Sequence, residues 1–143
     1  MLIPDVNILI LAHRPDAATG TSVAEWLTSQ IATDEPFGLP DAVWSGFLRI
    51  CTNPRIYADP SPIAVALAFL NDLFGAPAVL RIQPGARHHS IFTELCLGAN
   101  ARGVRVPDAY LAAMAIETSA TFITMDRGFG RYQGLKWRHP LQA

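Results

Sequence analysis

Charge is scarce in this sequence. Only 16% of the residues are charged, and the formal net charge at pH 7 is −1. This balance excludes a generally basic nucleic-acid-binding protein, so any contact with nucleic acid must be confined to a local site. Half of the residues are hydrophobic, which excludes an intrinsically disordered chain. The length predicts one domain over 1–143, large enough to bury a core of its own.

Cysteine and long apolar runs are lacking as well. Cys51 and Cys96 form no CxxC motif, so we expect buried free thiols in a reducing compartment. No stretch approaches the ~20 apolar residues of a membrane span. Pro4, Asp5 and Asn7 interrupt the first apolar run, which has no basic flank and does not resemble a signal peptide. We therefore expect a cytoplasmic protein that does not associate with a membrane.

Short apolar runs alternate with longer helical patterns along the chain. The run 1–12 reads as a strand that continues directly into a helix, followed by a loop over 13–20. Strands separated by helices predict an α/β fold with a mainly parallel central sheet and helices on both faces. Further strands are expected at 37–40, 78–82, 121–125 and 135–137. A second helix is expected to follow a capping box at Ser22–Glu25, a third to run from a cap at Asp41 to before Pro54, and a fourth to follow a cap at Ser61-Pro62. The last two helices are expected at 90–101 and 107–116.

Three acidic residues fall at the ends of these elements. Asp5 follows the first strand, Asp126 follows the strand at 121–125, and Asp108 begins the apolar helix. Ligands of parallel sheets bind beyond the carboxyl ends of the strands, so we expect Asp5 and Asp126 on one rim, with Asp108 facing it. An ordinary role stays open for each residue alone, as a helix cap for Asp5 and Asp108 and as part of a turn for Asp126.

The chemistry of three clustered carboxylates favours a divalent cation. Such groups raise one another's pKa unless something positive lies between them. Hard oxygen ligands fit Mg²⁺ or Mn²⁺ better than zinc, and the sequence has no histidine–cysteine spacing that would compete. An ion held in this way activates water and stabilises charge during displacement at phosphorus. Taken together, the three acids predict a metal site for phosphoryl chemistry.

Four segments, in their order and spacing, resemble the PIN-domain ribonucleases, and most closely the VapC toxins of toxin–antitoxin pairs. They are Asp5-Val-Asn7 and the runs 47–54, 107–113 and 124–129, and the resemblance covers essentially the whole chain. It implies a PIN-like α/β/α sandwich and a Mg²⁺- or Mn²⁺-dependent endoribonuclease that cuts RNA. It also implies a homodimer and a cognate antitoxin protein.

The resemblance also assigns roles to individual residues. Asp5, Asp108 and Asp126 become the metal-binding and catalytic acids, with Asn7 and Thr124 in support. On this basis the chain is expected to hydrolyse RNA phosphodiesters as the toxin of a type II pair.

Two positions depart from the family's pattern. Gly46 stands where a glutamate is frequent, and Gly128 stands where a second aspartate is usual. We therefore expect weak binding of a single ion, with substrate phosphate as a further ligand, and tighter metal binding in a Gly128→Asp variant. The alternative is a PIN-fold protein that binds RNA or an antitoxin without efficient cleavage.

Basic residues near the acids are candidates for contacts with RNA. Arg127 and Arg131 flank Asp126 and are the preferred phosphate contacts. Arg49 is a third candidate, although packing of its stem along a helix fits the pattern equally well. The adjacent pair His88-His89 is expected to face solvent rather than a metal.

A partner surface is predicted from hydropathy. The mean hydropathy of +0.23 is high for a small protein and indicates either a very apolar core or apolar surface that a partner covers. The helices that hold Trp44, Phe47, Ile63 and Leu67 are where we expect that surface.

Two other functional classes, one of enzymes and one of signalling domains, fit the sequence less well. A hydrolase with an aspartyl nucleophile would need a second acid two residues after Asp5, where Asn7 stands instead. A receiver-type signalling domain needs a lysine on a late strand, and Lys136 is the only lysine of the chain.

Overall fold

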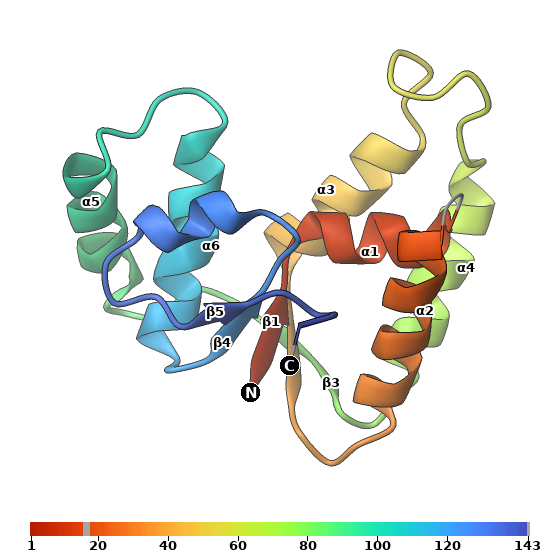
Figure 1. Cartoon of the computed structure of the whole chain (residues 1–143), viewed down its shortest axis with the longest axis horizontal. Coiled ribbons are helices and arrows are strands. Elements are labelled where there is room, and N and C mark those ends of the chain that lie inside the picture. Colours follow the sequence, from red (N-terminus) through yellow and green to blue (C-terminus); the bar gives the residue numbers. More distant parts are fainter. Residues whose placement is uncertain (16–17, 143) are drawn as a thin grey trace.

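The computed structural model describes residues 1–15 and 18–142, which form a parallel sheet flanked by helices (Figure 1). The expected loop over 13–20 lies partly outside the described residues. The strands are β1 (Leu2–Pro4), β2 (Phe37–Pro40), β3 (Val79–Ile82), β4 (Thr121–Ile123) and β5 (Trp137–Arg138). The helices are α1 (Val6–His13), α2 (Ala18–Ile31), α3 (Asp41–Cys51), α4 (Ile63–Phe74), α5 (His88–Gly98), α6 (Arg105–Glu117) and the 3₁₀ helix η1 (Arg127–Arg131).

The sheet has the strand order β3-β2-β1-β4-β5, and every pair is parallel. The chain runs outward from β1 to β2 and β3, then returns to the other side of β1 for β4 and β5. This reversal beside β1 opens a crevice at the carboxyl ends of β1 and β4, where ligands of such sheets bind. Helices α5 and α6 lie on one side of the strands and α1 to α4 on the other (Figure 1). The predicted α/β fold with a parallel sheet is therefore confirmed.

Strand β1 is buried along its whole length, which explains its uniformly apolar sequence. Leu2 pairs with Thr121 and Ile3 with Phe122, so β4 lies in register beside the first strand. A strand covered on both faces has no room for polar side chains, and its first acid comes only where the strand ends.

Helix α2 begins earlier than the capping motif predicted. It starts at Ala18, so Ser22 lies inside the helix and the expected capping box is wrong. Buried Gly20 lies unusually close to the backbone of Pro15.

The expected caps of α3 and α4 are also wrong, because Arg81 from β3 pairs with Asp41 and Arg14 bonds to Ser61. Asp41 is the first residue of α3 and accepts a hydrogen bond from Trp44 Nε1 at 2.9 Å. The Ser61 hydroxyl instead accepts from Arg14 at 2.9 Å. The residues that precede both helices are prolines, Pro40 and Pro62, which supply no capping side chain.

Helix α5 is shifted toward the N-terminus from its expected range of 90–101. It begins at His88 and leaves the helical path at Asn100, whose φ is +47°. The expectation that His88 faces solvent is wrong: its ring is buried against Tyr110, with Nε2 2.9 Å from the Tyr110 carbonyl oxygen. A histidine with a backbone partner packs as well as an apolar ring here.

Helix α4 buries one face and leaves another exposed. Ala66, Leu70 and Leu73 are buried, whereas Ile63 and Leu67 are 54% and 42% exposed. The helix is apolar on nearly every side, so spacing alone does not select a face.

Both cysteines are free thiols, as expected, with Cys51 buried and Cys96 partly buried. Within the described residues, no helix is both long enough and apolar enough to cross a membrane.

The close approach of α2 to the preceding turn is testable. A Cβ on Gly20 would lie 2.8 Å from Pro15 Cα, so Gly20→Ala should lower the free energy of unfolding by about 1–3 kcal/mol, although alanine favours helix. The matched control is Gly98→Ala at the end of α5, where nothing lies within 4 Å. That change should leave stability unchanged or raise it by up to about 1 kcal/mol. Chemical denaturation of both variants decides, and equal effects would contradict the packing argument.

Candidate active site

The ends of β1 and β4 bring two acids to one rim. The backbone N–H of Asp5 donates to the carbonyl oxygen of Ile123, the last residue of β4, at 2.8 Å. Asp5 directly follows β1, Asp126 lies shortly after the end of β4, and each of the two acids precedes a helix. Asp108, in the first turn of α6, lies near enough to both for its charge to act on them. The three acids therefore lie within electrostatic range of one another, and their joint role at the rim stays a prediction.

The Asp5 carboxylate is buried, with 8% of the residue exposed, and both of its oxygens accept hydrogen bonds. Oδ1 accepts from the N–H of Val6 at 2.7 Å, so Asp5 does cap α1. Oδ2 accepts from the Thr124 hydroxyl at 2.6 Å and from Asn7 Nδ2 at 3.1 Å. The capping role and the place on the rim thus belong to the same side chain.

Thr124 is the hub of this network and is fully buried. Its hydroxyl donates to Asp5 and accepts from the N–H of Asp126 at 3.0 Å and from Asn7 Nδ2 at 3.3 Å. Asn7 in turn accepts from the N–H of Met125 at 3.4 Å. One hydroxyl therefore ties the end of β1 to the segment that carries Asp126.

The carboxylates destabilise one another's charge. Burial, with smaller contributions from the charges of Asp108 and Asp126, raises the pKa of Asp5 to about 6, although the hydrogen bonds from Thr124 and Val6 act in the opposite direction. Burial and then Asp126 raise the pKa of Asp108, while Arg131 and Arg105 lower it. A cation at the rim would relieve this repulsion.

The donor set fits a hard divalent ion that takes part of its ligands from water or substrate. All three acids offer oxygen ligands, which suit Mg²⁺ and Mn²⁺. Among the described residues, no three acidic, histidine or cysteine side chains converge into a ready-made cage. Mg²⁺ in proteins is commonly held by one or two carboxylates together with waters and phosphates, so the rim is compatible with that mode.

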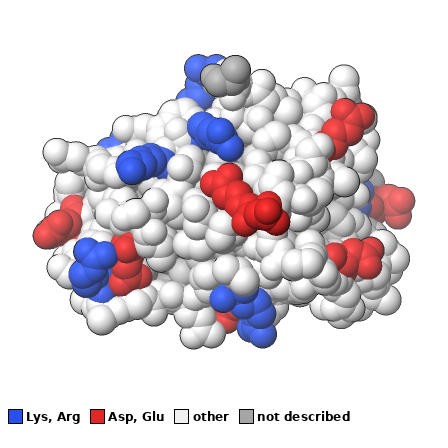
Figure 2. All heavy atoms as spheres, turned by 90° about the horizontal axis from the view of Figure 1, so that it is seen from below, with Lys and Arg blue, Asp and Glu red and all other residues white. Residues whose placement is uncertain are grey.

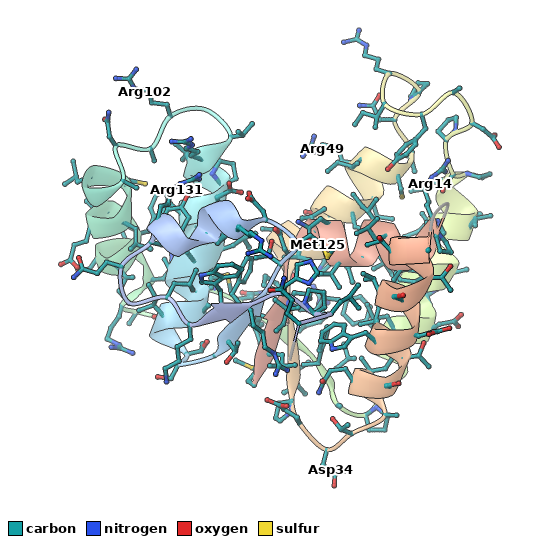
Figure 3. All side chains as sticks on the ribbon, viewed as in Figure 1. Arg14, Asp34, Arg49, Arg102, Met125 and Arg131 are labelled. Atoms are coloured by element: carbon teal, nitrogen blue, oxygen red, sulfur yellow. The ribbon has the colours of Figure 1, made fainter. Side chains whose placement is uncertain are left out.

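A cleft of about 590 Å³ opens beside Asp5 and Asp108. One wall comes from α1 and α3 and the other from α5, α6 and the loop between them. Arg49 projects from α3 on the upper side of the molecule, in the gap between the two groups of helices (Figure 3). The remaining lining is mostly apolar and includes Val6, Ile50, Phe92, Val104, Val106, Pro107, Tyr110 and Leu111.

Gly46 keeps the α3 wall of this cleft open. A Cβ built there would lie 3.3 Å from Val6 Cγ2. The position that is often acidic in the resembling family therefore lines the cleft without adding a charge.

The arginines are distributed unevenly around the acids. Arg131 lies close enough to Asp108 to lower its pKa, and Arg49 lines the opposite wall of the cleft. Arg127 begins η1 and is exposed, and within the described residues no contact joins it to the three acids. The sequence interpretation missed Arg105, which also acts on Asp108. Its place three residues before Asp108 in the same helix was the available signal.

Comparison with known proteins gives a consistent family. The family model described as PIN domain matches residues 2–135. Ribonuclease VapC43 of Mycobacterium tuberculosis and a VapC ribonuclease of Mycobacterium bovis are each 43% identical over 143 residues, covering 100% of this chain and 97% of the relative. Ribonuclease VapC25 of Mycobacterium tuberculosis is 39% identical over 140 residues, covering 98% of this chain and 99% of the relative.

Solved structures show the same fold. A chain of the VapBC2 structure from Rickettsia felis, bound to a promoter DNA fragment, matches with a TM-score of 0.72 at 15% identity and covers 96% of this chain and 97% of that one. A chain of VapBC-1 from nontypeable Haemophilus influenzae matches with a TM-score of 0.72 at 11% identity, covering 99% and 98%. At these identities the likeness concerns the fold.

The role of Thr124 as a hub can be measured. Thr124→Val removes the shortest hydrogen bond to the buried Asp5 carboxylate and leaves the Asp126 N–H without its partner, so the free energy of unfolding should fall by about 1–3 kcal/mol. Thr93 provides the control, because it is exposed on α5 and its hydroxyl donates only along its own helix to His89. Thr93→Val should change stability by no more than about 0.5 kcal/mol. A similar loss in both variants would mean that Thr124 is not a hub.

Proposed function

Since the chain belongs to the PIN-domain family and, within it, to the VapC ribonucleases, we propose that it is a Mg²⁺- or Mn²⁺-dependent endoribonuclease that acts in the cytoplasm as the toxin of a type II toxin–antitoxin pair. One observation supports this most: acids from three separate elements, Asp5, Asp108 and Asp126, lie together at the carboxyl ends of β1 and β4. We treat residues 1–143 as a single catalytic domain.

Asp5, Asp108 and Asp126 would hold the divalent ion. When bound, the ion supplies an activated water and stabilises negative charge on the phosphate. The protein's own contribution is to keep Asp5 in one orientation. The Thr124 hydroxyl and the Asn7 amide occupy one carboxylate oxygen, so the group reaches the rim with its rotamer already set.

RNA contacts must be local, because the molecule as a whole carries little net charge. On the face seen from below in Figure 2, basic and acidic groups of the described residues are interspersed, and the basic ones form no continuous patch there. Arg49 and Arg131 lie around the acid rim and are the proposed phosphate contacts. Arg127 is proposed as a more peripheral contact, since it is exposed on the same short helix as Arg131.

An antitoxin is the second proposed partner. The solved structures that share this fold include VapBC and FitAB structures. In this chain, the apolar cleft with two carboxylates on its floor fits a peptide segment that presents apolar side chains and one basic group. Such a segment would cover both the cleft and the acids.

A homodimer is proposed through the exposed side of α4. On α3, the other helix where the partner surface is expected, Phe47 is fully buried and belongs to the core. Ile63 and Leu67, one turn apart on α4, are exposed and form the apolar strip that a second copy would cover.

The catalytic proposal predicts that Asp5→Asn, Asp108→Asn and Asp126→Asn each lower the rate of RNA cleavage by more than about 100-fold. Loss of a residue that only supports a metal ligand costs up to roughly 100-fold in activity, and loss of a ligand itself should cost more. The melting temperature without metal should hold or rise, because burial raises the pKa of Asp5 to about 6 and its charge is therefore unfavourable in the folded state. Initial rates on single-stranded RNA with Mg²⁺ and with Mn²⁺ measure the effect.

Asp72→Asn is the matched control, because Asp72 is exposed on α4 and does not line the cleft. It should cleave RNA like the wild-type protein. Full activity in Asp5→Asn would end the proposal. Inactivity of the wild-type protein with both metals would favour the alternative of a PIN-fold protein that binds RNA or an antitoxin without efficient cleavage.

The dimer proposal predicts that the protein without an antitoxin runs as a dimer in light scattering coupled to gel filtration. Leu67→Glu should shift it to monomer while thermal unfolding stays cooperative, because a buried charge would be left unpaired at the interface. Leu97→Glu, on the exposed side of α5, is the control and should remain dimeric. A monomeric wild-type protein at high concentration would rule the dimer out.

A further inference from the structure

Gly128 lies in contact with a cation rather than in open space. Asp126 precedes η1, and its Oδ1 accepts a hydrogen bond from the N–H of Gly128 at 2.7 Å. A Cβ built on Gly128 would lie 2.6 Å from Arg131 Nη2 and 2.9 Å from Asp126 Oδ1. The guanidinium of Arg131 therefore occupies the space that any side chain at position 128 would need.

Backbone conformation does not explain this glycine. Within the described residues, the glycines with a left-handed φ are Gly103 and Gly134, and Gly128 is not among them. What position 128 requires is room beside Asp126. The room is taken by a charged group from the next turn of the same short helix.

Arg131 is directed toward the acids without being neutralised by them. Its Nη2 and Asp126 Oδ1 both lie within 2.9 Å of the position that a Cβ on Gly128 would take, which places the guanidinium beside the rim. Within the described residues, neither of the two ion pairs involves Arg131. The guanidinium also lies 5.9 Å from the ring centre of Tyr132, whose hydroxyl donates to the carbonyl oxygen of Arg105 and so ties η1 to α6.

We infer that Gly128 and Arg131 form one functional unit, in which the absent side chain lets the Arg131 guanidinium bind the scissile phosphate at the acid rim. The inference rests on the proposed ribonuclease function and adds a catalytic residue to it. A guanidinium presents two parallel donors to phosphate oxygens and keeps its charge at any physiological pH. The guanidinium would stabilise the negative charge on the phosphate. At a rim with more carboxylates, a second metal ion would have this role.

The unit changes what Gly128→Asp should do. Counting charges alone predicts that a fourth carboxylate tightens metal binding. In this structure the new carboxylate would lie against the Arg131 guanidinium and pair with it, because the two groups would be in contact. The affinity for the metal ion should then change little, and Arg131 should no longer be available to bind the substrate.

The test compares Arg131→Gln, Gly128→Asp and the double variant with the wild-type protein. The control is Arg102→Gln, because Arg102 is exposed on the loop between α5 and α6 and points away from the body of the molecule (Figure 3). Two quantities are measured: kcat and KM on single-stranded RNA with Mg²⁺, and calorimetric binding of Mn²⁺ without RNA. Thermal unfolding checks that each variant folds.

We expect Arg131→Gln and Gly128→Asp each to lower kcat by about 100-fold, the usual cost of losing one group that stabilises transition-state charge. KM should change far less, and Arg102→Gln should match the wild-type protein. Mn²⁺ affinity should stay near the wild-type value in Gly128→Asp and rise by about tenfold or more in the double variant, where the added carboxylate has no arginine to pair with.

Two results would overturn the inference: a wild-type kcat in Arg131→Gln, or Mn²⁺ binding by Gly128→Asp as tight as by the double variant. If the wild-type protein and Arg102→Gln cleave no RNA, the proposed function fails instead. The calorimetry then still decides whether position 128 and Arg131 compete for the same space.

Discussion

The hydrogen bond from the Thr124 hydroxyl to the buried Asp5 carboxylate, at 2.6 Å, is the interaction on which the site depends. It joins residues 119 positions apart in sequence. It also compensates part of the cost of burying a carboxylate, because burial raises the pKa of Asp5 and this bond lowers it. Without it, the ends of β1 and β4 would carry an acid with too few partners at the very point where the sheet opens.

The position of this bond follows from the topology of the sheet. Strands β1 and β4 are neighbours although most of the chain lies between them, and the sequence reverses its direction of travel across the sheet at that place. Crevices of parallel sheets form at such reversals. The apolar strands supply rigid supports, and the first polar residue after each of them is delivered to a common edge.

The charged residues on which the proposed function depends lie at this edge of the sheet. Asp5, Asp108 and Asp126 oppose one another, and Arg131 and Arg105 offset part of that repulsion at Asp108. The neighbouring cleft is mostly apolar and adds Arg49 from the other wall. A binding site with local charge inside an apolar cleft is consistent with an overall net charge of −1.

The sequence by itself determined the α/β class, the parallel sheet and the three rim acids, because these depend on local patterns: buried strands read as unbroken apolar runs, and acids stand out where such runs end. Tertiary structure decided the rest. Ser61 and Asp41 prefer capping in isolation, but Arg14 and Arg81 engage them in the fold, and α4 buries one of several apolar faces only because of what packs on it. Gly128 appeared in the sequence as a missing ligand. Only the folded chain shows that the Arg131 guanidinium fills its place, since that contact depends on how η1 turns back on itself.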